Sequence, residues 1–134
     1  MNDNNIFGEI IYSYTPAQAI ADGVLIDVSE AAKEAGFKIP VVMTETVWDQ
    51  YVAWADDDTE KQIIQDQSGR LQDILWLLYL ACKRSHTESS CIYEVNIIPR
   101  DGYSKTPVPT RLKSVIDRGD NGEPVITLML PNED

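Results

Sequence analysis

Apolar residues recur along the middle of this chain at helical spacing. From Trp48 they fall at positions i, i+3, i+4 and i+7, and Thr44 precedes them as a candidate N-cap. A later run of nine residues, Ile74 to Cys82 (ILWLLYLAC), is apolar throughout. An unbroken run of this kind is typical of a helix buried on most sides. The pattern predicts central helices at about 44–57 and 70–84.

Strict alternation replaces this spacing after residue 90. In Cys91–Ile98 the residues Tyr93 and Val95 face one way and Glu94 and Asn96 the other. This alternation and two further apolar segments predict strands at about 91–98, 111–116 and 125–130, with a turn at Asp120–Gly122 before the last of them. We therefore expect an α+β fold in which the central helices pack on a small antiparallel C-terminal meander.

Shorter elements are expected before residue 44. A helix is predicted from Thr15 to about Asp22, a strand at 24–28, and a second helix at 29–35 that Ser29 caps and Gly36 ends. In the extended segment 38–43, Pro40 is compatible only with an edge strand or a strand start. A chain of 134 residues fits one domain, 1–134, and we expect flexible extremities at about 1–5 and 131–134.

The composition is that of a globular cytoplasmic protein. Hydrophobic residues make up 43% of the chain and charged residues 25%. The N-terminus lacks the basic and apolar regions of a signal peptide, and no apolar run approaches the roughly 20 residues of a membrane span. The two cysteines do not form a disulfide framework. We expect a location in the reducing cytoplasm and no contact with membranes.

Negative charge is concentrated in the first part of the chain. Residues 1–60 contain twelve acidic and two basic residues, whereas residues 61–134 contain ten and nine. Ten of the eleven surplus negative charges therefore precede residue 61. Because phosphate contacts need Lys and Arg, this charge argues against direct binding of nucleic acid. It favours a protein partner with a basic surface.

The candidate partner-binding carboxylates lie on the first central helix and in the polar stretch 56–69, which is either a loop or a helical extension. They are Glu45, Asp49, Asp56, Asp57, Asp58 and Glu60. Glu45 and Asp49 also suit the positive end of a helix dipole. The acidic run resembles a calcium loop, but Lys61 and Gln67 occupy the positions that need Gly and Glu. No metal site is predicted.

Other chemistry is weakly supported. Cys82, His86 and Cys91 are close in sequence, but no obvious fourth ligand other than Glu88 accompanies them, and both cysteines belong to apolar patterns typical of core residues. The chain contains no phosphate-binding, dinucleotide-binding or hydrolase motif. The absence of these motifs, together with the presence of a single histidine, favours a protein that is not an enzyme and uses no cofactor.

The long segment between the first two predicted strands of the meander supports an alternative. It is rich in proline and carries basic and aromatic residues that could bind an anion: Arg100, Tyr103, Lys105 and Arg111. A small enzyme or ligand-binding domain with an anion site near residues 99–113 is therefore the second hypothesis. Charge balance on an acidic surface is the favoured explanation of the same residues.

The three tryptophans divide into two groups. Trp48 and Trp76 are predicted to lie in the core. Trp54 leaves the apolar stripe of its helix, so we predict it at an interface.

Two stretches resemble a family of small uncharacterised proteins from bacteria and their mobile elements, including plasmids and phages. They are DGVLIDVSEAAKEAGFKIPVVMT (22–44) and DRGDNGEPVITLMLPNED (117–134). The resemblance covers the chain from Ile6 onward. It supplies no catalytic motif, and it implies the context of a mobile-element accessory protein.

The main functional hypothesis follows from the charge and this context. A non-enzymatic acidic protein could inhibit a host protein by occupying its basic, nucleic-acid-binding surface, and such binding should weaken with salt. A homodimer is compatible with this hypothesis. In it, the acidic N-terminal half of one copy would contact the more basic C-terminal half of the other.

Overall fold

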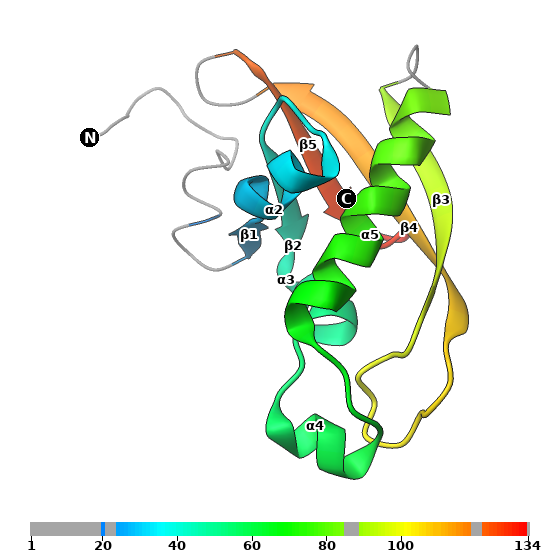
Figure 1. Ribbon diagram of the computed structural model, residues 1–134. Helices are drawn as coiled ribbons and strands as arrows, with labels where there is room; N and C mark the ends of the chain where they lie inside the picture. Colours follow the sequence, from blue (N-terminus) through cyan, green and yellow to red (C-terminus); the bar gives the residue numbers. More distant parts are fainter. Residues whose placement is uncertain (1–19, 21–23, 85–88, 119–121, 134) are drawn as a thin grey trace.

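Five strands form one mixed sheet in the computed structural model of this chain, which describes residues 20, 24–84, 89–118 and 122–133 (Figure 1). The strands are β1 (Leu25–Asp27), β2 (Val41–Thr44), β3 (Ser90–Ile97), β4 (Val108–Arg118) and β5 (Pro124–Met129). Their spatial order is β1-β2-β5-β4-β3. Neighbouring strands are antiparallel except β2 and β5, which are parallel.

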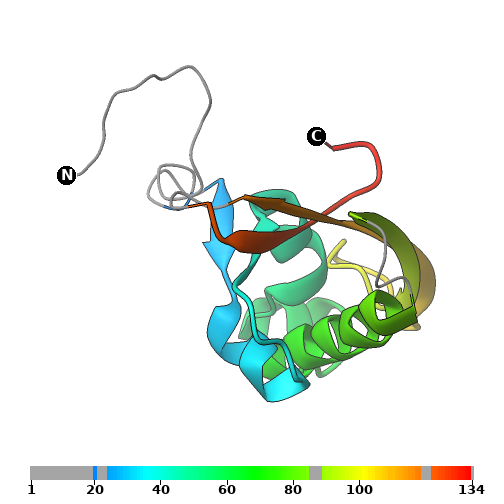
Figure 2. The same ribbon diagram turned by 90° about the horizontal axis from the view of Figure 1, so that it is seen from above.

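The described helices cover one face of this sheet, as Figure 2 shows. They are α2 (Ser29–Ala35), α3 (Glu45–Val47), the π-helix η1 (Trp48–Val52), α4 (Asp56–Lys61) and α5 (Gln67–Arg84). The fold class is therefore α+β, as the periodicities predict. None of the described helices has the length and apolar character needed to cross a membrane.

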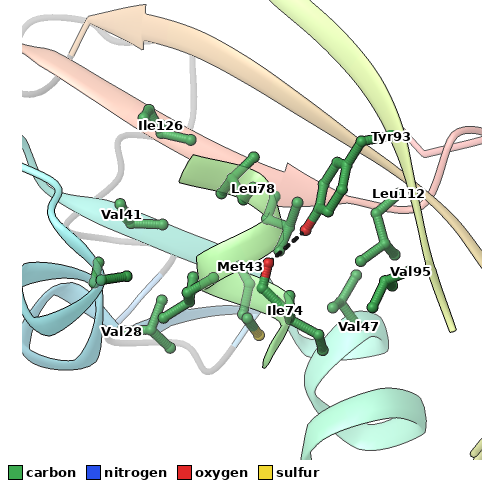
Figure 3. Close-up of a cluster of buried hydrophobic side chains, with 14 of the residues drawn as sticks. Val28, Val41, Met43, Val47, Ile74, Leu78, Tyr93, Val95, Leu112 and Ile126 are labelled. Atoms are coloured by element: carbon green, nitrogen blue, oxygen red, sulfur yellow. Dashed lines mark hydrogen bonds between the residues drawn. The ribbon is translucent and has the colours of Figure 1, made fainter. Parts of the chain in front are cut away.

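The hydrophobic core lies between α5 and the sheet (Figure 3). Ile74 and Leu78 of α5 pack against the inward side chains of β3 and β4, among them Tyr93 and Leu112. The buried hydroxyl of Tyr93 donates a hydrogen bond to the carbonyl oxygen of Ile74 at 3.0 Å. The alternation in β3 is confirmed, since Tyr93, Val95 and Ile97 are buried whereas Glu94 and Asn96 are exposed.

The parallel pairing of β2 with β5 places the β2 segment inside the sheet. β2 begins directly after Pro40, whose carbonyl accepts a hydrogen bond from the Ile126 amide, so the strand-start interpretation of Pro40 is the one that holds. Val41, Val42 and Met43 are all buried. A strand buried on both faces shows no alternation, and for this reason the local pattern could not place it.

The strand predicted at 111–116 extends to Val108–Arg118. It includes Pro109, which lies directly opposite Asn96. The Ile116 amide bonds to the carbonyl of the opposed Ser89, so the hydrogen-bonded pairs of this ladder involve the odd-numbered residues of β3. Pro109 therefore occupies a pair that needs no amide hydrogen from it, which explains why proline is tolerated here.

The prediction of one helix at 44–57 is wrong. Thr44 does cap α3, since its hydroxyl accepts the Val47 amide at 3.3 Å, but the helix widens to π geometry and ends at Val52. Ala53 adopts an extended conformation with ψ 137°. A separate helix, α4, then begins at Asp56, within the stretch for which a loop and a helical extension were the alternatives.

Two of the tryptophan predictions are reversed. Trp54 is 8% exposed, because the chain turns after η1 and places the indole under the guanidinium of Arg70. Trp76 is 50% exposed and stacks on Tyr79, with 5.9 Å between the ring centres. Helix α5 is thus less completely buried than its apolar sequence indicates. The buried apolar side chains of α5 are Ile74, Leu75, Leu78 and Ala81.

Other predictions concern the two ends of the chain and the start of α2. The helix predicted at 15–22 and the extremity 1–5 lie outside the described residues, apart from Ile20. Near the C-terminus, a carboxylate oxygen of Glu133 accepts hydrogen bonds from the Thr44 hydroxyl and the Leu130 amide. The prediction that Ser29 caps α2 is wrong, because Ser29 is the first residue of the helix. Its backbone amide donates a hydrogen bond to a carboxylate oxygen of Asp27.

Gly36 ends α2 as predicted, with φ 118°, and its replacement by alanine tests this turn. A Cβ here would lie 2.9 Å from the ring of Tyr79. Backbone strain and displacement of this ring should together lower the free energy of unfolding by roughly 2 kcal/mol or more. Gly102→Ala is the matched control, because Gly102 also has positive φ (90°) but has open space around it. Equal losses in urea titrations of both variants would contradict the role of Tyr79.

Candidate functional site

Helix α4 and the segment 99–107 lie side by side at one end of the molecule (Figure 1). A carboxylate oxygen of Asp58 joins them, accepting hydrogen bonds from the Ala55 amide at 2.8 Å and from Nε of Arg100 at 2.9 Å. The first bond caps α4, and the second is a charge-assisted link to the segment after β3. Two candidate groups from different hypotheses, Asp58 and Arg100, are thus bound to each other.

The environment of Asp58 favours its charged form. Burial by itself would raise the pKa of this carboxyl group, since only 9% of the residue is exposed. The Ala55 amide, together with the hydrogen bond and the positive charge of Arg100, more than compensates and holds the pKa below its usual value. Asp58 is therefore an ionised structural residue rather than part of an exposed acidic face.

Gln62 fixes the segment 99–107 against the end of α4. Its Nε2 donates to the carbonyl oxygens of Pro99 and Ser104, and its Oε1 accepts from the Gly102 amide at 3.0 Å. The side chain is 5% exposed. All polar atoms of this buried amide side chain thus have backbone partners, which holds the segment in one conformation.

Asp101 orders the tip of the same segment. One of its carboxylate oxygens accepts from the Tyr103 and Ser104 amides, and the other accepts from the Ser104 hydroxyl. The hydrogen bond from the Ser104 hydroxyl is the main cause that lowers the pKa of Asp101. This carboxylate is exposed and carries its charge at neutral pH.

The surface of this end combines negative charge with apolar side chains. Asp56, Asp57 and Glu60 of α4 are exposed, as is Asp101. Ile64 is 77% exposed and Tyr103 is 75% exposed. Gln62 bonds to the backbone of Gly102 and Ser104, on either side of Tyr103, and Ile64 lies two residues after Gln62 in the chain. The side chains of Tyr103 and Ile64 therefore both belong to this end. We call the six residues the acidic end: Asp56, Asp57, Glu60, Ile64, Asp101 and Tyr103.

The remaining acidic candidates lie on other elements. Glu45 is exposed in the first turn of α3, and Asp49 is exposed on η1. The extended residues 53–55 separate them from α4. The six predicted carboxylates therefore do not share one helix, although the Arg100 amide, bonded to the Gln50 carbonyl, connects η1 to the acidic end.

The four candidate anion-binding residues have different surroundings. Arg100 is paired with Asp58, whereas Arg111 lies on β4 directly opposite Glu94 of β3. Tyr103 and Lys105 are exposed on the segment 99–107. The two guanidinium groups thus have different carboxylate neighbours.

Cys82 and Cys91 are half-buried at the end of α5 and the start of β3, and both pack against the hydrophobic core. Burial is the main cause that raises the pKa of the Cys82 thiol, and a hydrogen bond with Ser114 opposes it only in part. His86 lies outside the described residues. Within the described ranges, no three Cys, His, Asp or Glu side chains form a cluster that could hold a metal ion.

Arg70 is the central buried polar residue near this end and was not among the candidates. It is 3% exposed, and its guanidinium donates to the carbonyls of Val52 at 3.1 Å and Ile98 at 2.8 Å. The group lies 4.4 Å from the ring centre of Trp54. Burial lowers the pKa of Arg70 to about 10, although the charge of Asp58 opposes this effect, so the group remains positive at neutral pH.

Arg70 and Gln62 both hold this end together, and neither was predicted as a site residue. Only Arg70 has a recognisable pattern in the sequence. Arg70 shares the helical stripe of Ile74, Leu78 and Ala81, so its spacing alone indicates burial. Gln62 follows the last turn of α4 and belongs to no periodic pattern.

Comparison with known sequences places the chain in a family. A family of unknown function (DUF6573) matches residues 1–134. The chain belongs to this family. Searches of curated proteins and of solved structures find no match. Membership of the family therefore agrees with the resemblance to uncharacterised proteins and assigns no role to any residue.

Proposed function

We propose that this protein is a non-enzymatic interaction protein whose acidic end binds a partner protein with a basic surface. The observation that carries the proposal is the composition of that end, which combines four exposed carboxylates with two large exposed apolar side chains. Carboxylates alone would serve solubility equally well. Ile64 and Tyr103 add the apolar contact that protein interfaces need at their centre.

The rigidity of this end supports the proposal. The bond between Asp58 and Arg100 and the three bonds of Gln62 order α4 and the segment 99–107 before any partner arrives. A surface that is already ordered loses less conformational entropy on binding. Glu45 and Asp49 are exposed on α3 and η1 and add negative charge outside the acidic end.

The partner is proposed to be a cytoplasmic protein that uses its basic surface to bind nucleic acid. An ordered set of carboxylates can replace phosphate groups at Lys and Arg side chains. This is the action expected of a mobile-element accessory protein that inhibits a host protein. The alternative anion site gains no support, because Arg100 and Arg111 face different carboxylates.

Neutralising α4 without disturbing its cap tests the proposal. The variant Asp56→Asn/Asp57→Asn/Glu60→Gln retains Asp58 and should lose proteins that wild type captures from a bacterial lysate at low salt. Exposed ion pairs contribute about 0.2–1 kcal/mol each, so the three changes should raise the Kd of a purified partner by roughly 3- to 150-fold. High salt should likewise raise the Kd of wild type for its partner.

The control variant Glu30→Gln/Glu34→Gln/Asp117→Asn makes an equal change of net charge away from this end and should retain binding. An oligonucleotide should compete with the protein for its purified partner. Equal capture by wild type and the α4 variant at both salt concentrations would overturn the proposal. If the oligonucleotide competes, the protein binds the surface that the partner uses for nucleic acid. If it does not compete, the partner is a basic protein of another kind.

A further inference from the structure

The free edge of β3 is a second surface, and it is independent of the acidic end. Among the described strands β3 has one neighbour, β4, and it is eight residues long. The odd-numbered residues of β3 form its hydrogen-bonded pairs with β4, as the bond between Ile116 and Ser89 shows. The backbone N–H and C=O groups of the even-numbered residues therefore point away from β4. These residues are Ser90, Ile92, Glu94 and Asn96.

Edge strands of this kind are normally protected, because their unpaired backbone groups can add another strand. The even-numbered residues of β3 include no proline and no lysine, and Ile92 is 51% exposed. Beside this edge runs the C-terminal half of α5 (Figure 1). A groove of about 320 Å³ separates the two elements, lined by Leu77, Leu80 and Arg84 from α5 and by Ile92 from β3, among others.

The flank of α5 at this groove is complementary to itself in the antiparallel direction. Asp73, Leu77, Leu80 and Arg84 lie on one stripe, because they are spaced by four, three and four residues. If a second α5 lies antiparallel, Leu77 meets Leu80 of the other copy, and Asp73 meets its Arg84. Each contact then occurs twice, as a two-fold interface requires. Asp73 and Arg84 are both exposed in the single chain.

The strand is complementary to itself about the same axis. With Ile92 opposite its own copy, Glu94 lies opposite Ser90 of the other chain. This register would form about six backbone hydrogen bonds. The groove already places Leu77 and Leu80 beside Ile92 and Tyr93, so one axis serves both the strands and the helices.

From this geometry we infer that the chain forms a homodimer through antiparallel β3–β3 pairing, with the two α5 helices packed beside the joined sheets. This interface differs from a contact between an acidic half and a basic half, and it leaves the acidic end of each copy exposed. The net charge of −11 opposes association at long range. At physiological salt, such repulsion is screened beyond about 8 Å, whereas the contacts of Asp73 with Arg84 are direct.

Reversal of the paired charges is the decisive experiment. By sedimentation velocity at about 5 to 500 µM, wild type should change from a 15.1 kDa monomer to a dimer. Asp73→Arg and Arg84→Asp should each raise the dimer Kd at least tenfold, because like charges then meet. The double variant Asp73→Arg/Arg84→Asp should return to within about threefold of wild type. Glu60→Arg makes the same charge change as Asp73→Arg, but on α4, and should dimerise as wild type does.

The strand is tested separately by Ile92→Pro, which removes an N–H that points away from β4 and leaves that ladder intact. This variant should stay monomeric with an unchanged circular dichroism spectrum. If it does not fold, hydrogen exchange of wild type gives the same information. The Ile92 and Glu94 amides should be protected at high protein concentration and exchange quickly in Asp73→Arg. A monomer at every concentration, or a dimer that the charge reversals leave unchanged, would overturn the inference.

Discussion

Replacement of Arg70 by methionine is expected to lower the free energy of unfolding by about 3 kcal/mol. The Val52 and Ile98 carbonyls, which end η1 and follow β3, would lose their charged donor in a site from which water is excluded. The contact with Trp54 would also lose its cationic part. Methionine keeps most of the side-chain volume, so the loss reports the polar interactions rather than a cavity. Urea unfolding of both proteins measures it.

Two controls separate this effect from a general loss of charge. Arg70→Lys keeps the charge but cannot reach two carbonyls in the geometry of a guanidinium, so it should lie between methionine and wild type. Lys61→Met removes an exposed positive charge near the same end, and its effect should stay within about 0.5 kcal/mol. If Arg70→Met were as stable as wild type, the buried guanidinium would not be what joins these segments.

Removal of the Asp58 carboxylate is expected to lower the free energy of unfolding by roughly 2 kcal/mol. Asp58→Ala loses both the cap of α4 and the bond to Arg100, and it leaves the Arg100 guanidinium without this partner. Amide hydrogen exchange should accelerate in residues 56–62 and 99–104 and change little in α5. Asp57→Ala is the matched control, because the neighbouring carboxylate is exposed and its ion pair with Lys61 lies at the surface.

The same carboxylate predicts a pH dependence with a definite sign. Because the folded pKa of Asp58 lies below its usual value, the native state favours the ionised form. Its contribution is fully present above the unfolded pKa of about 3.9 and is lost as the pH falls through the folded value. The stability difference between wild type and Asp58→Asn should therefore be constant from about pH 7 to 5 and shrink below about pH 4. A difference that grows on acidification would contradict this assignment.

Charge counting predicted where the acidic residues gather along the chain but not the surroundings of each one. Asp56, Asp57 and Glu60 are exposed as expected, whereas Asp58, in the same run, is buried against Arg100. Nothing in the polar run 56–62 distinguishes the carboxylate that turns inward. That choice depends on where the segment after β3 lies.

The periodicities predicted the elements whose shape depends on neighbours in the sequence. Helix α5, the alternation of β3 and the left-handed turn at Gly36 were all correct, because one amphipathic stripe, one pleat or one missing Cβ decides each. The antiparallel pairing of β3, β4 and β5 follows from their order along the chain. The sequence by itself thus determined the α+β class, the strong negative charge and its position before residue 61.

Only the tertiary structure decided how distant segments meet. β2 pairs in parallel with β5, η1 ends at the carbonyl that Arg70 binds, and Asp58 contacts an arginine 42 residues away. These contacts satisfy backbone and charged groups that burial would otherwise leave without partners, and the partner in each case lies far along the chain. Local pattern contains no information on such partners. For this reason the ordered acidic end and the free edge of β3 became visible only in the folded molecule.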